Sequence, residues 1–483
     1  MRLFFREISC EGRERIPTDG AGLVVSWHPN GLIDPALILA YFPGKIVFGA
    51  RHGLFAWPAL GWLMRRVGTV PIYRAADRSR MSLEERRKAN QASLDALARE
   101  LASGSYSALF PEGLSHDQPH LAKLKTGAAR LYYRARELTP AHESPPVIVP
   151  VGLHYDRKDV FRSRVLITFC DPIDLPADLD VRPSDEETEG ERHSRYRRLT
   201  QEIERTLVEV VRATDNWALH RLMHRARELM RAERAVRAEA HPDRPSISER
   251  DLGFARIWYA YRERSQSHPA AMEALERDVS DYDRRMRAIG LRDHELVRNP
   301  RLVSPALLGL LALQVVAVYL VLPPILFVGY LVSGPPYLLL KRLARAFSKA
   351  DKDAATIKVL GGAVLFPVAW GLAAYLAARA HSRLHLAFPS IPDVPVVVAV
   401  LTVILGILGG LLALRYNELA RQTLHAVRVR VTRRRRKRTV EHLLETRSRL
   451  YEEFVRLGEG LHLPGAVAAD GTIVSNPEGY PRS

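Results

Sequence analysis

The strongest constraint on this chain is a long stretch without charge. Residues 302–340 contain no Asp, Glu, Lys or Arg, and this is nearly twice the roughly 20 residues that one helix needs to cross a bilayer. Pro323 and Pro324 lie near the middle of the stretch, where their missing N–H groups and ring clashes break a helix. The stretch therefore predicts a hairpin of two membrane-embedded helices.

Two more apolar segments follow the predicted hairpin. Val359–Ala378 and Pro395–Leu414 are each about 20 residues long, which is enough for one further pass apiece. We thus expect a transmembrane region over residues 302–415 with about four membrane-embedded segments. Lys and Arg are dense between Lys341 and Lys358, after the hairpin, and between Arg415 and Arg438, whereas the connection between the last two segments has only Arg379 and Arg383. Heavily basic stretches stay in the cytoplasm. We expect an integral membrane protein, of the cell inner membrane or the endoplasmic reticulum type, with its N-terminal domain in the cytoplasm.

The charge of the chain limits its partners. The formal net charge is +17, which favours a negatively charged partner. The run Arg433–Arg438 follows the last apolar segment and suits anionic head groups of membrane lipids; a nucleic-acid arm and a simple topology signal are the alternatives. Because the run has no interleaved aromatic residues and lies beside a membrane segment, we expect no nucleic acid.

The pattern of the N-terminal third is different. Residues 1–183 alternate short apolar runs with helix-like stretches, which is typical of an α/β domain. One helix is well marked, because Ser82 can cap it with Glu85 three positions on, and Gly104 follows its end. Six runs are predicted to be strands: Ala21–Trp27, Lys45–Gly49, Val70–Tyr73, Ser105–Phe110, Val147–Leu153 and Val165–Cys170.

The remaining regions complete the expected fold class. Residues 184–301 are rich in Glu, Arg, Ala and Leu, which predicts a charged helical region acting as a spacer or an oligomerisation surface. Residues 416–483 are expected to form a basic cytoplasmic tail. Only two cysteines, Cys10 and Cys170, occur, which argues against a disulfide scaffold and against a cysteine-based metal site.

The first predicted strand leads into the candidate catalytic residues. His28 stands at its end and Asp34 follows six positions later, where α/β folds carry their sites. On a regular helix these side chains point about 240° apart, so they meet only if Gly31 turns the chain tightly. If they meet, the carboxylate stabilises the imidazolium while the other ring nitrogen takes a proton from a hydroxyl. Asp34 alternatively suits the N-cap of a helix with Pro35 in its first position.

Residues suited to an anionic substrate follow the later strands. A guanidinium after the third run can grip a phosphate or form an ordinary ion pair. A Glu-Gly-Leu-Ser turn after the fourth run offers close backbone approach, a hydroxyl and N–H groups, or is an ordinary surface turn. A lysine lies shortly beyond this turn, and a proline lies inside the fifth run. The guanidinium is that of Arg74, the turn contains Glu112, Gly113 and Ser115, the lysine is Lys125 and the proline is Pro150.

The four blocks together resemble the ordered motifs of the glycerolipid acyltransferases, typified by 1-acylglycerol-3-phosphate acyltransferase. The blocks lie at residues 28–35 (His-Pro-Asn-Gly-Leu-Ile-Asp-Pro), 68–77, 110–117 (Phe-Pro-Glu-Gly-Leu-Ser-His-Asp) and 149–152. They look most like the branch with fungal-type glycerol-3-phosphate and dihydroxyacetone-phosphate acyltransferases. The usual motif has four residues between His and Asp, whereas this chain has five. A second pair, His154 and Asp159, has the usual spacing but follows the last block.

The resemblance implies direct transfer of a fatty acyl group from acyl-CoA or acyl-carrier protein to a hydroxyl of glycerol 3-phosphate, in phospholipid synthesis. It implies no metal and no cofactor besides the acyl thioester, and dihydroxyacetone phosphate and lysophosphatidate remain open as acceptors. A non-catalytic membrane lipid-binding or scaffold protein is the alternative class. The resemblance implies that His28 acts as the general base together with Asp34. It implies that the phosphorylated acceptor is bound by Arg74, Glu112, Gly113 and Ser115, with help from Lys125. Pro150 is implied to line the acyl side of the site.

Overall fold

The computed structural model describes Met1 and residues 3–73, 82–140, 142–184, 186–297, 305–347 and 351–475. The chain divides into two compact units. The first covers Met1–His220 with a short segment that ends at Thr356, and the second covers the rest of the chain.

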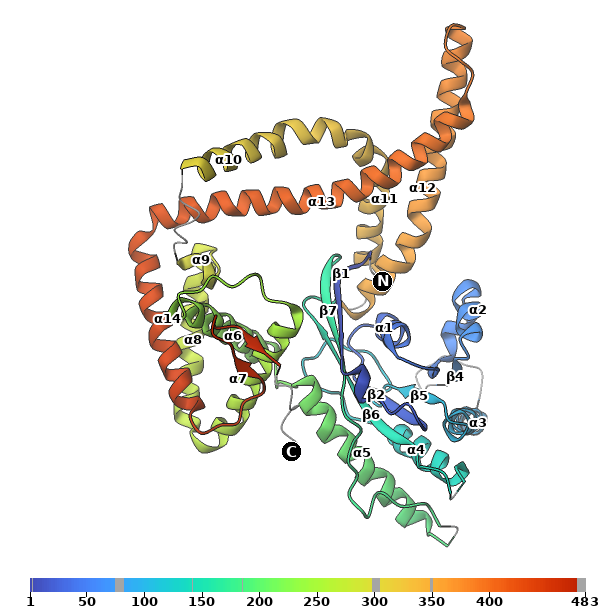
Figure 1. Cartoon of the computed structure of the whole chain (residues 1–483). Helices are drawn as coiled ribbons and strands as arrows, with labels where there is room; N and C mark the ends of the chain where they lie inside the picture. The colour runs from blue at the N-terminus through green and yellow to red at the C-terminus, as the bar shows by residue number, and fades with distance from the viewer. Residues whose placement is uncertain are drawn as a thin grey trace. The chain divides into compact units, whose positions relative to one another are not determined.

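The first unit is an α/β domain built on a seven-stranded sheet (Figure 1). The strand order in space is β1-β7-β6-β2-β5-β3-β4, and all neighbouring strands run parallel except β6 and β7. Its strands are β1 (Phe5–Glu11), β2 (Gly22–Ser26), β3 (Ile46–Arg51), β4 (Val70–Ile72), β5 (Tyr106–Leu109), β6 (Val147–Tyr155) and β7 (Ser163–Phe169).

Six of the seven strands coincide with the predicted runs, and β1 is the exception. It lies at the edge of the sheet and most of its residues are only partly buried. An edge strand of this kind needs no continuous apolar run, so its sequence carries little strand signal. The α/β class predicted for this part of the chain is confirmed.

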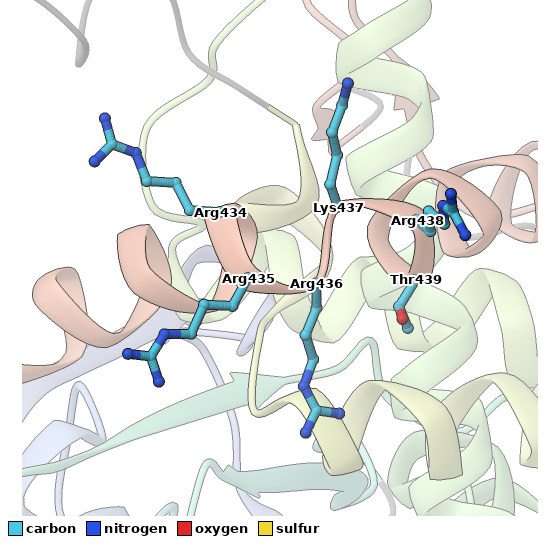
Figure 2. Close-up of a pocket in the computed structure, with 6 residues that line it drawn as sticks. All are labelled: Arg434, Arg435, Arg436, Lys437, Arg438 and Thr439. Atoms are coloured by element: carbon cyan, nitrogen blue, oxygen red, sulfur yellow. The ribbon is translucent and has the colours of Figure 1, made fainter.

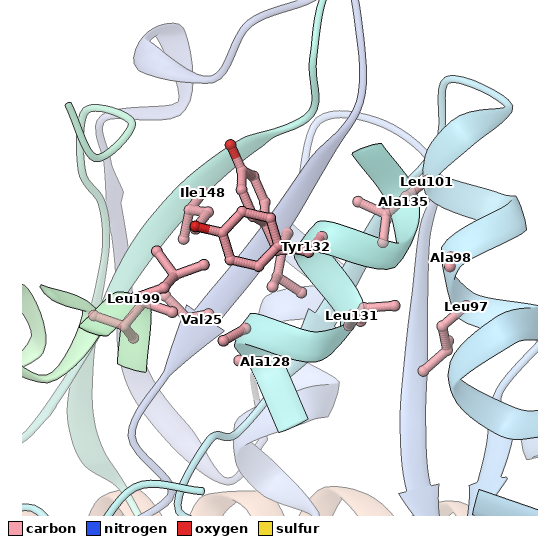
Figure 3. Close-up of a cluster of buried hydrophobic side chains, with 14 of the residues drawn as sticks. Val25, Leu97, Ala98, Leu101, Ala128, Leu131, Tyr132, Ala135, Ile148 and Leu199 are labelled. Carbon is pink, nitrogen blue, oxygen red and sulfur yellow. The ribbon is translucent and has the colours of Figure 1, made fainter. Parts of the chain in front are cut away.

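Helices cover both faces of the sheet. On one face, α3, α4 and α5 pack on β2, β3 and β6 around a core that includes Leu23, Val25 and Ile148 (Figure 3). On the other face lies α1, after which Phe42 contacts the rings of Tyr106 and Phe169. The helices of this unit are α1 (Ile33–Tyr41), α2 (Pro58–Arg66), α3 (Leu83–Ala102), α4 (Gly127–Leu138) and α5 (Glu189–Val211), with 3-10 turns η1 (Arg13–Arg15) and η2 (His52–Ala56).

Two helices of this unit bear on the sequence predictions. The predicted capping of α3 is confirmed, because the Ser82 hydroxyl accepts from the Glu85 N–H and the Glu85 carboxylate accepts from the Ser82 N–H. The unit continues past residue 183, the expected domain limit, because α5 contributes Leu199, Ile203 and Leu207 to the core. The first helix of the charged region is therefore an integral part of the α/β domain.

The second unit is helical. It contains most of α6 (Trp217–Arg237), α7 (Ile247–Ser267), α8 (Pro269–Ile289), α9 (Asp293–Leu296), α10 (Pro305–Val316), the π-helical turn η4 (Ala317–Val321), α11 (Leu322–Phe347), most of α12 (Asp351–Ala387), α13 (Pro395–Arg435), α14 (Lys437–Gly458) and a small hairpin of β8 (Ala466–Val467) and β9 (Ile473–Val474). In its core the side chain of Arg447 is buried and donates to Glu233 at 2.9 Å and to the backbone oxygen of Asp293 at 2.8 Å.

The apolar helices differ from the predicted hairpin plus two passes. Within the described residues two helices, Ala354–Ala387 and Pro395–Arg435, are long and apolar enough to cross a membrane. A third span exists only if Gly309–Pro324 and Gly329–Phe347, which meet at 88°, count as one. The prolines at 323 and 324 fall in the first turn of α11, where a missing N–H is tolerated. They therefore accompany a right-angled bend, and the hairpin prediction was wrong.

Small residues let α11 and α13 approach closely. A Cβ added to Gly409 would lie 2.6 Å from the Cα of Gly329, so the two backbones touch there. Close by, the Ser333 hydroxyl donates to the Gly406 oxygen at 3.0 Å. Close approach of small residues and hydrogen bonds of this kind hold helices together in lipid.

The basic run lies where α13 ends and α14 begins. The break falls at Arg436, and the hollow beside it is lined by residues 434–439. Figure 2 shows that Arg434 and Lys437 point to one side of the chain and Arg436 to the other. The run therefore presents its charges in several directions. Its expected role in binding anionic head groups stays a prediction.

Candidate active site

The loop after β2 brings His28 and Asp34 together. Nδ1 of His28 lies 2.9 Å from Oδ2 of Asp34. Gly31 adopts a φ of +43° between them, which is the tight turn that the six-residue separation requires. Helix α1 begins at Ile33 with Leu32 as its N-cap and without a side-chain cap, so the alternative interpretation of Asp34 as an N-cap was wrong.

The carboxylate of Asp34 is buried among donors. Its side chain is 0% exposed, and besides His28 it accepts from the Asn30 N–H at 2.7 Å and from the Tyr155 hydroxyl at 2.5 Å. Burial, together with the neighbouring Asp34 charge, raises the pKa of Tyr155 well above its usual value. Tyr155 therefore keeps its proton and acts as a donor. A buried carboxylate with several donors is held in one orientation.

The imidazole of His28 is held on two sides. Its ring stacks on Phe110 at a centroid distance of 4.1 Å, and Phe110 is followed in the chain by the Glu112 loop. Nδ1 is engaged by Asp34, and among the described residues no hydrogen bond occupies Nε2. The side chain is 12% exposed. The arrangement leaves Nε2 as the nitrogen that can take a proton.

Glu112 connects the first and third blocks. Its side chain is fully buried, and Oε1 accepts the backbone N–H of His28 at 3.0 Å. Oε2 contacts Nε2 of His116 and accepts the N–H of Ala122 at 2.7 Å. The N–H of His116 in turn donates to the backbone oxygen of His28 at 3.2 Å. The carboxylate thus ties the two loops together, and both of its oxygens are used by the chain itself.

Gly113 and Lys125 lie beside each other next to this connection. Gly113 has a φ of +67°, and a Cβ there would come within 2.8 Å of the Lys125 ammonium. The N–H of Lys125 donates to the backbone oxygen of Pro111 at 2.9 Å. Ser115 is half-buried in the same loop. A positive charge therefore lies against the glycine of the third block.

Pro150 lies apart from these loops. Pro150 is buried in the interior of the sheet, paired with Val25 on the β2 side, and strand alternation puts it on the same face as Ile148. Arg74 lies outside the described residues. His154, the rival base, lies beside Gly152 and near Val210 of α5, since a Cβ added at Gly152 would meet both side chains. This is the opposite face of β6 from Tyr155.

The sequence prediction missed two residues of the site, Tyr155 and Lys158. The Lys158 ammonium donates to the backbone oxygens of Pro29 at 2.9 Å and His116 at 3.3 Å, and pairs with Asp117 at 2.5 Å. It therefore holds the first and third blocks together from a third loop. The available signal was that both residues follow the apolar run of β6, at the edge of the sheet where the other blocks end.

Within the described ranges no group of three or more His, Cys, Asp or Glu side chains is placed to hold a metal ion. The chemistry that the site can perform with its own groups is proton transfer at His28.

Comparisons with known proteins bear on the same residues. A family model described as Acyltransferase matches residues 7–154, which include His28, Asp34 and Glu112. The glycerol-3-phosphate O-acyltransferase 1 of Saccharomyces cerevisiae is 24% identical over 265 residues, 55% of this chain and 33% of that protein. The chloroplastic 1-acyl-sn-glycerol-3-phosphate acyltransferase LPAT1 of Arabidopsis thaliana is 27% identical over 150 residues, 31% of this chain and 36% of that protein.

The matches are partial in length. The chain spans about a third of each of these two relatives. Among solved structures, the 1-acyl-sn-glycerophosphate acyltransferase PlsC of Thermotoga maritima is similar with 20% identity and a TM-score of 0.28, over 42% of this chain and 73% of that one. The family match over residues 7–154 and the similarity to these relatives support an acyltransferase domain of the glycerolipid type in the N-terminal part of this chain.

Proposed function

We propose that the chain is a membrane-bound O-acyltransferase that transfers a fatty acyl group from acyl-CoA or acyl-carrier protein to a hydroxyl of glycerol 3-phosphate, in phospholipid synthesis. The observation that carries this proposal is the 2.9 Å contact between His28 and the buried carboxylate of Asp34, which leaves Nε2 open. The relatives named for glycerol-3-phosphate and 1-acylglycerol-3-phosphate acylation support a phosphorylated glycerol as the acceptor.

In the proposed mechanism, His28 acts as the general base. Nε2 takes the proton of the acceptor hydroxyl while its oxygen attacks the thioester carbonyl carbon. Asp34 accepts from Nδ1–H and stabilises the imidazolium that forms. The carbon–sulfur bond then breaks, and the proton on His28 passes to the leaving thiolate. The products are the ester and the free thiol, and no covalent enzyme intermediate is required.

The two carboxyl groups of the site have different proposed roles. Asp34 supports the base, whereas Glu112 positions the loops, because both Glu112 oxygens are engaged by the chain and a carboxylate repels a phosphate. The acceptor phosphate is instead assigned to positive and neutral donors. These are Arg74, Gly113, Ser115 and Lys125; Pro150, expected on the acyl side, is buried in the sheet and is given no contact with the substrate.

The proposal is tested with the purified full-length chain in lipid vesicles. Initial rates are measured with one acyl-CoA and each of three acceptors, glycerol 3-phosphate, dihydroxyacetone phosphate and lysophosphatidate, with products identified by mass. We expect the highest kcat/KM with glycerol 3-phosphate. His28→Ala should lower kcat by about 10²- to 10⁴-fold, the usual contribution of a general base.

His142→Ala is the matched control, because this histidine is exposed on the same unit, away from the dyad. It should leave the rate unchanged. Undiminished turnover by His28→Ala would reject His28 as the base. A higher kcat/KM with another acceptor would move the assignment to that substrate. Absence of thiol release with every acceptor would favour the lipid-binding scaffold.

We further propose that the first unit and the basic C-terminal part lie on the cytoplasmic side of the membrane. The dense Lys and Arg flanks of the apolar segments support this orientation. In sealed, right-side-out vesicles, an impermeant protease should leave an N-terminal tag intact and should remove it after permeabilisation. Removal of the tag before permeabilisation would reverse the orientation. Anionic lipid heads are proposed partners of Arg433–Arg438.

A further inference from the structure

Large apolar side chains are exposed on the helix after β3. Trp57 is 60% exposed and Trp62 is 62% exposed, and Leu63 follows at 50%. They belong to α2 and to the residue before it, while Met64 of the same helix is buried. The helix is thus attached to the domain along one side and presents indole rings on the other. Exposed indoles of this size on one short segment mark an interaction surface.

The segment of sequence that contains these side chains carries charge of one sign. Residues 35–76 contain no Asp or Glu but five Lys or Arg. Two of the five, Arg65 and Arg66, are exposed in the last turn of α2, directly after the exposed Leu63. Tryptophan with arginine on a short helix is the composition of segments that lie in the interface of a bilayer. The positive charges complement anionic lipid head groups.

The position of α2 connects this surface to the candidate active site. Helix α2 and the turn η2 follow β3, which runs parallel to β2 and β5 in the sheet. The carboxyl ends of parallel strands meet at one edge, so α2 leaves the same edge as His28 and Glu112. At this edge a row of rings joins β3, the strand before α2, to His28, since Phe48 of β3 stacks with Phe110, which stacks on His28. Figure 1 shows α2 beyond β4, away from the helices that cover the faces of the sheet.

We propose that α2, with Trp57, docks on the surface of a bilayer that contains anionic lipid, inserting Trp57, Trp62 and Leu63 between the head groups. The same chain carries two helices long and apolar enough to cross a membrane, so a bilayer lies within reach of this domain. Docking turns the catalytic edge of the sheet toward the acyl chains of the membrane. This surface goes beyond the proposed acyl transfer, and its test does not depend on catalysis.

The test places a nitroxide label at position 62 of the full-length chain. Trp62→Cys is made in a background with Cys10→Ser and Cys170→Ser, and the protein is reconstituted in phosphatidylcholine vesicles with phosphatidylglycerol. Collisions with oxygen, which concentrates in lipid, are compared with collisions with a water-soluble nickel chelate. Lys88→Cys, on the exposed side of α3, is the matched control. We expect a several-fold higher oxygen-to-nickel ratio at position 62 than at position 88.

Two further measurements sharpen the result. Arg65→Gln with Arg66→Gln should lower the ratio at position 62, as should vesicles without phosphatidylglycerol. If the cysteine-free background does not fold, the native-cysteine chain is used. Quenching of its tryptophan emission by brominated lipid should then decrease in the Trp57→Phe/Trp62→Phe variant. Equal collision ratios at positions 62 and 88, or unchanged quenching, would overturn the proposal. Dipolar broadening between nitroxides would also overturn it, because a second copy would then cover α2.

Discussion

The hydrogen bond from Tyr155 to Asp34 gives the sharpest quantitative prediction. Tyr155→Phe removes only the hydroxyl that donates to Oδ1 of Asp34 at 2.5 Å, where Asp34 is fully buried and Tyr155 is half-buried. A hydrogen bond to a charged group contributes about 1.5 to 3 kcal/mol. Asp34 keeps its other two partners, Asn30 and His28. The carboxylate therefore stays in place but stabilises the imidazolium less.

If this loss falls on the transition state, kcat drops by about 10- to 150-fold, because 1.36 kcal/mol corresponds to a factor of ten. KM should change little, since Tyr155 contacts the dyad through Asp34 and is assigned no contact with the substrate. Initial rates at saturating and limiting glycerol 3-phosphate separate the two constants. Tyr41→Phe is the matched control, because Tyr41 belongs to α1, as Asp34 does, and makes no hydrogen bond among the described residues.

The thermal unfolding of both variants is followed in parallel. A fall in kcat with an unfolding transition close to that of the unmodified chain assigns the effect to the site. An unchanged kcat in a folded Tyr155→Phe protein would refute the reasoning, and so would a loss confined to KM. Either result would mean that Asp34 is oriented well enough by its other partners.

The remaining predictions concern stability and packing. Ser82→Ala removes the cap of α3 and should lower the free energy of unfolding by about 1 kcal/mol, measured by denaturant titration; an unchanged midpoint would contradict it. Arg447→Met leaves the buried Glu233 carboxylate with only the half-exposed Arg237 at 3.3 Å and should cost up to about 3 kcal/mol, seen as a drop in Tm, whereas an unaltered Tm would show that the pair is dispensable. Gly409→Ala pushes α13 against the backbone of Gly329, 2.6 Å from the added Cβ, and should lower Tm in detergent, while Gly371→Ala, which meets nothing within 4 Å, should not.

The sequence predicted the local structure of the first unit well. Short apolar runs bounded by Gly, Pro or charge identify buried strands, and the Ser82–Glu85 pair identifies the start of α3. Edge strand β1 was not predicted, because its residues are half exposed and mixed in polarity. The two prolines in the apolar stretch before residue 340 correctly predicted a break in the helix, but they did not predict the angle between the two helical segments. Proline weakens a helix locally, whereas the 88° direction depends on packing partners such as Gly409 on α13.

The candidate site was predictable only in part. The contact between His28 and Asp34 is local, so one turn at Gly31 suffices to form it. Tyr155 and Lys158 reach the same loop from more than 120 residues away. Their proximity depends on β6 lying next to β2 in the sheet, and no local pattern carries strand order. The inward direction of Glu112 escaped for the same reason, since its partners come from two different loops.

The limit of the matched family region has a practical consequence for anyone who prepares the catalytic domain alone. The match ends at residue 154, one position short of Tyr155 and well before α5, whose leucines close the apolar core. A fragment cut at that limit would lose a donor to Asp34 and expose the helix-covered side of the sheet to water, inviting aggregation. Expression boundaries drawn after His220 keep both.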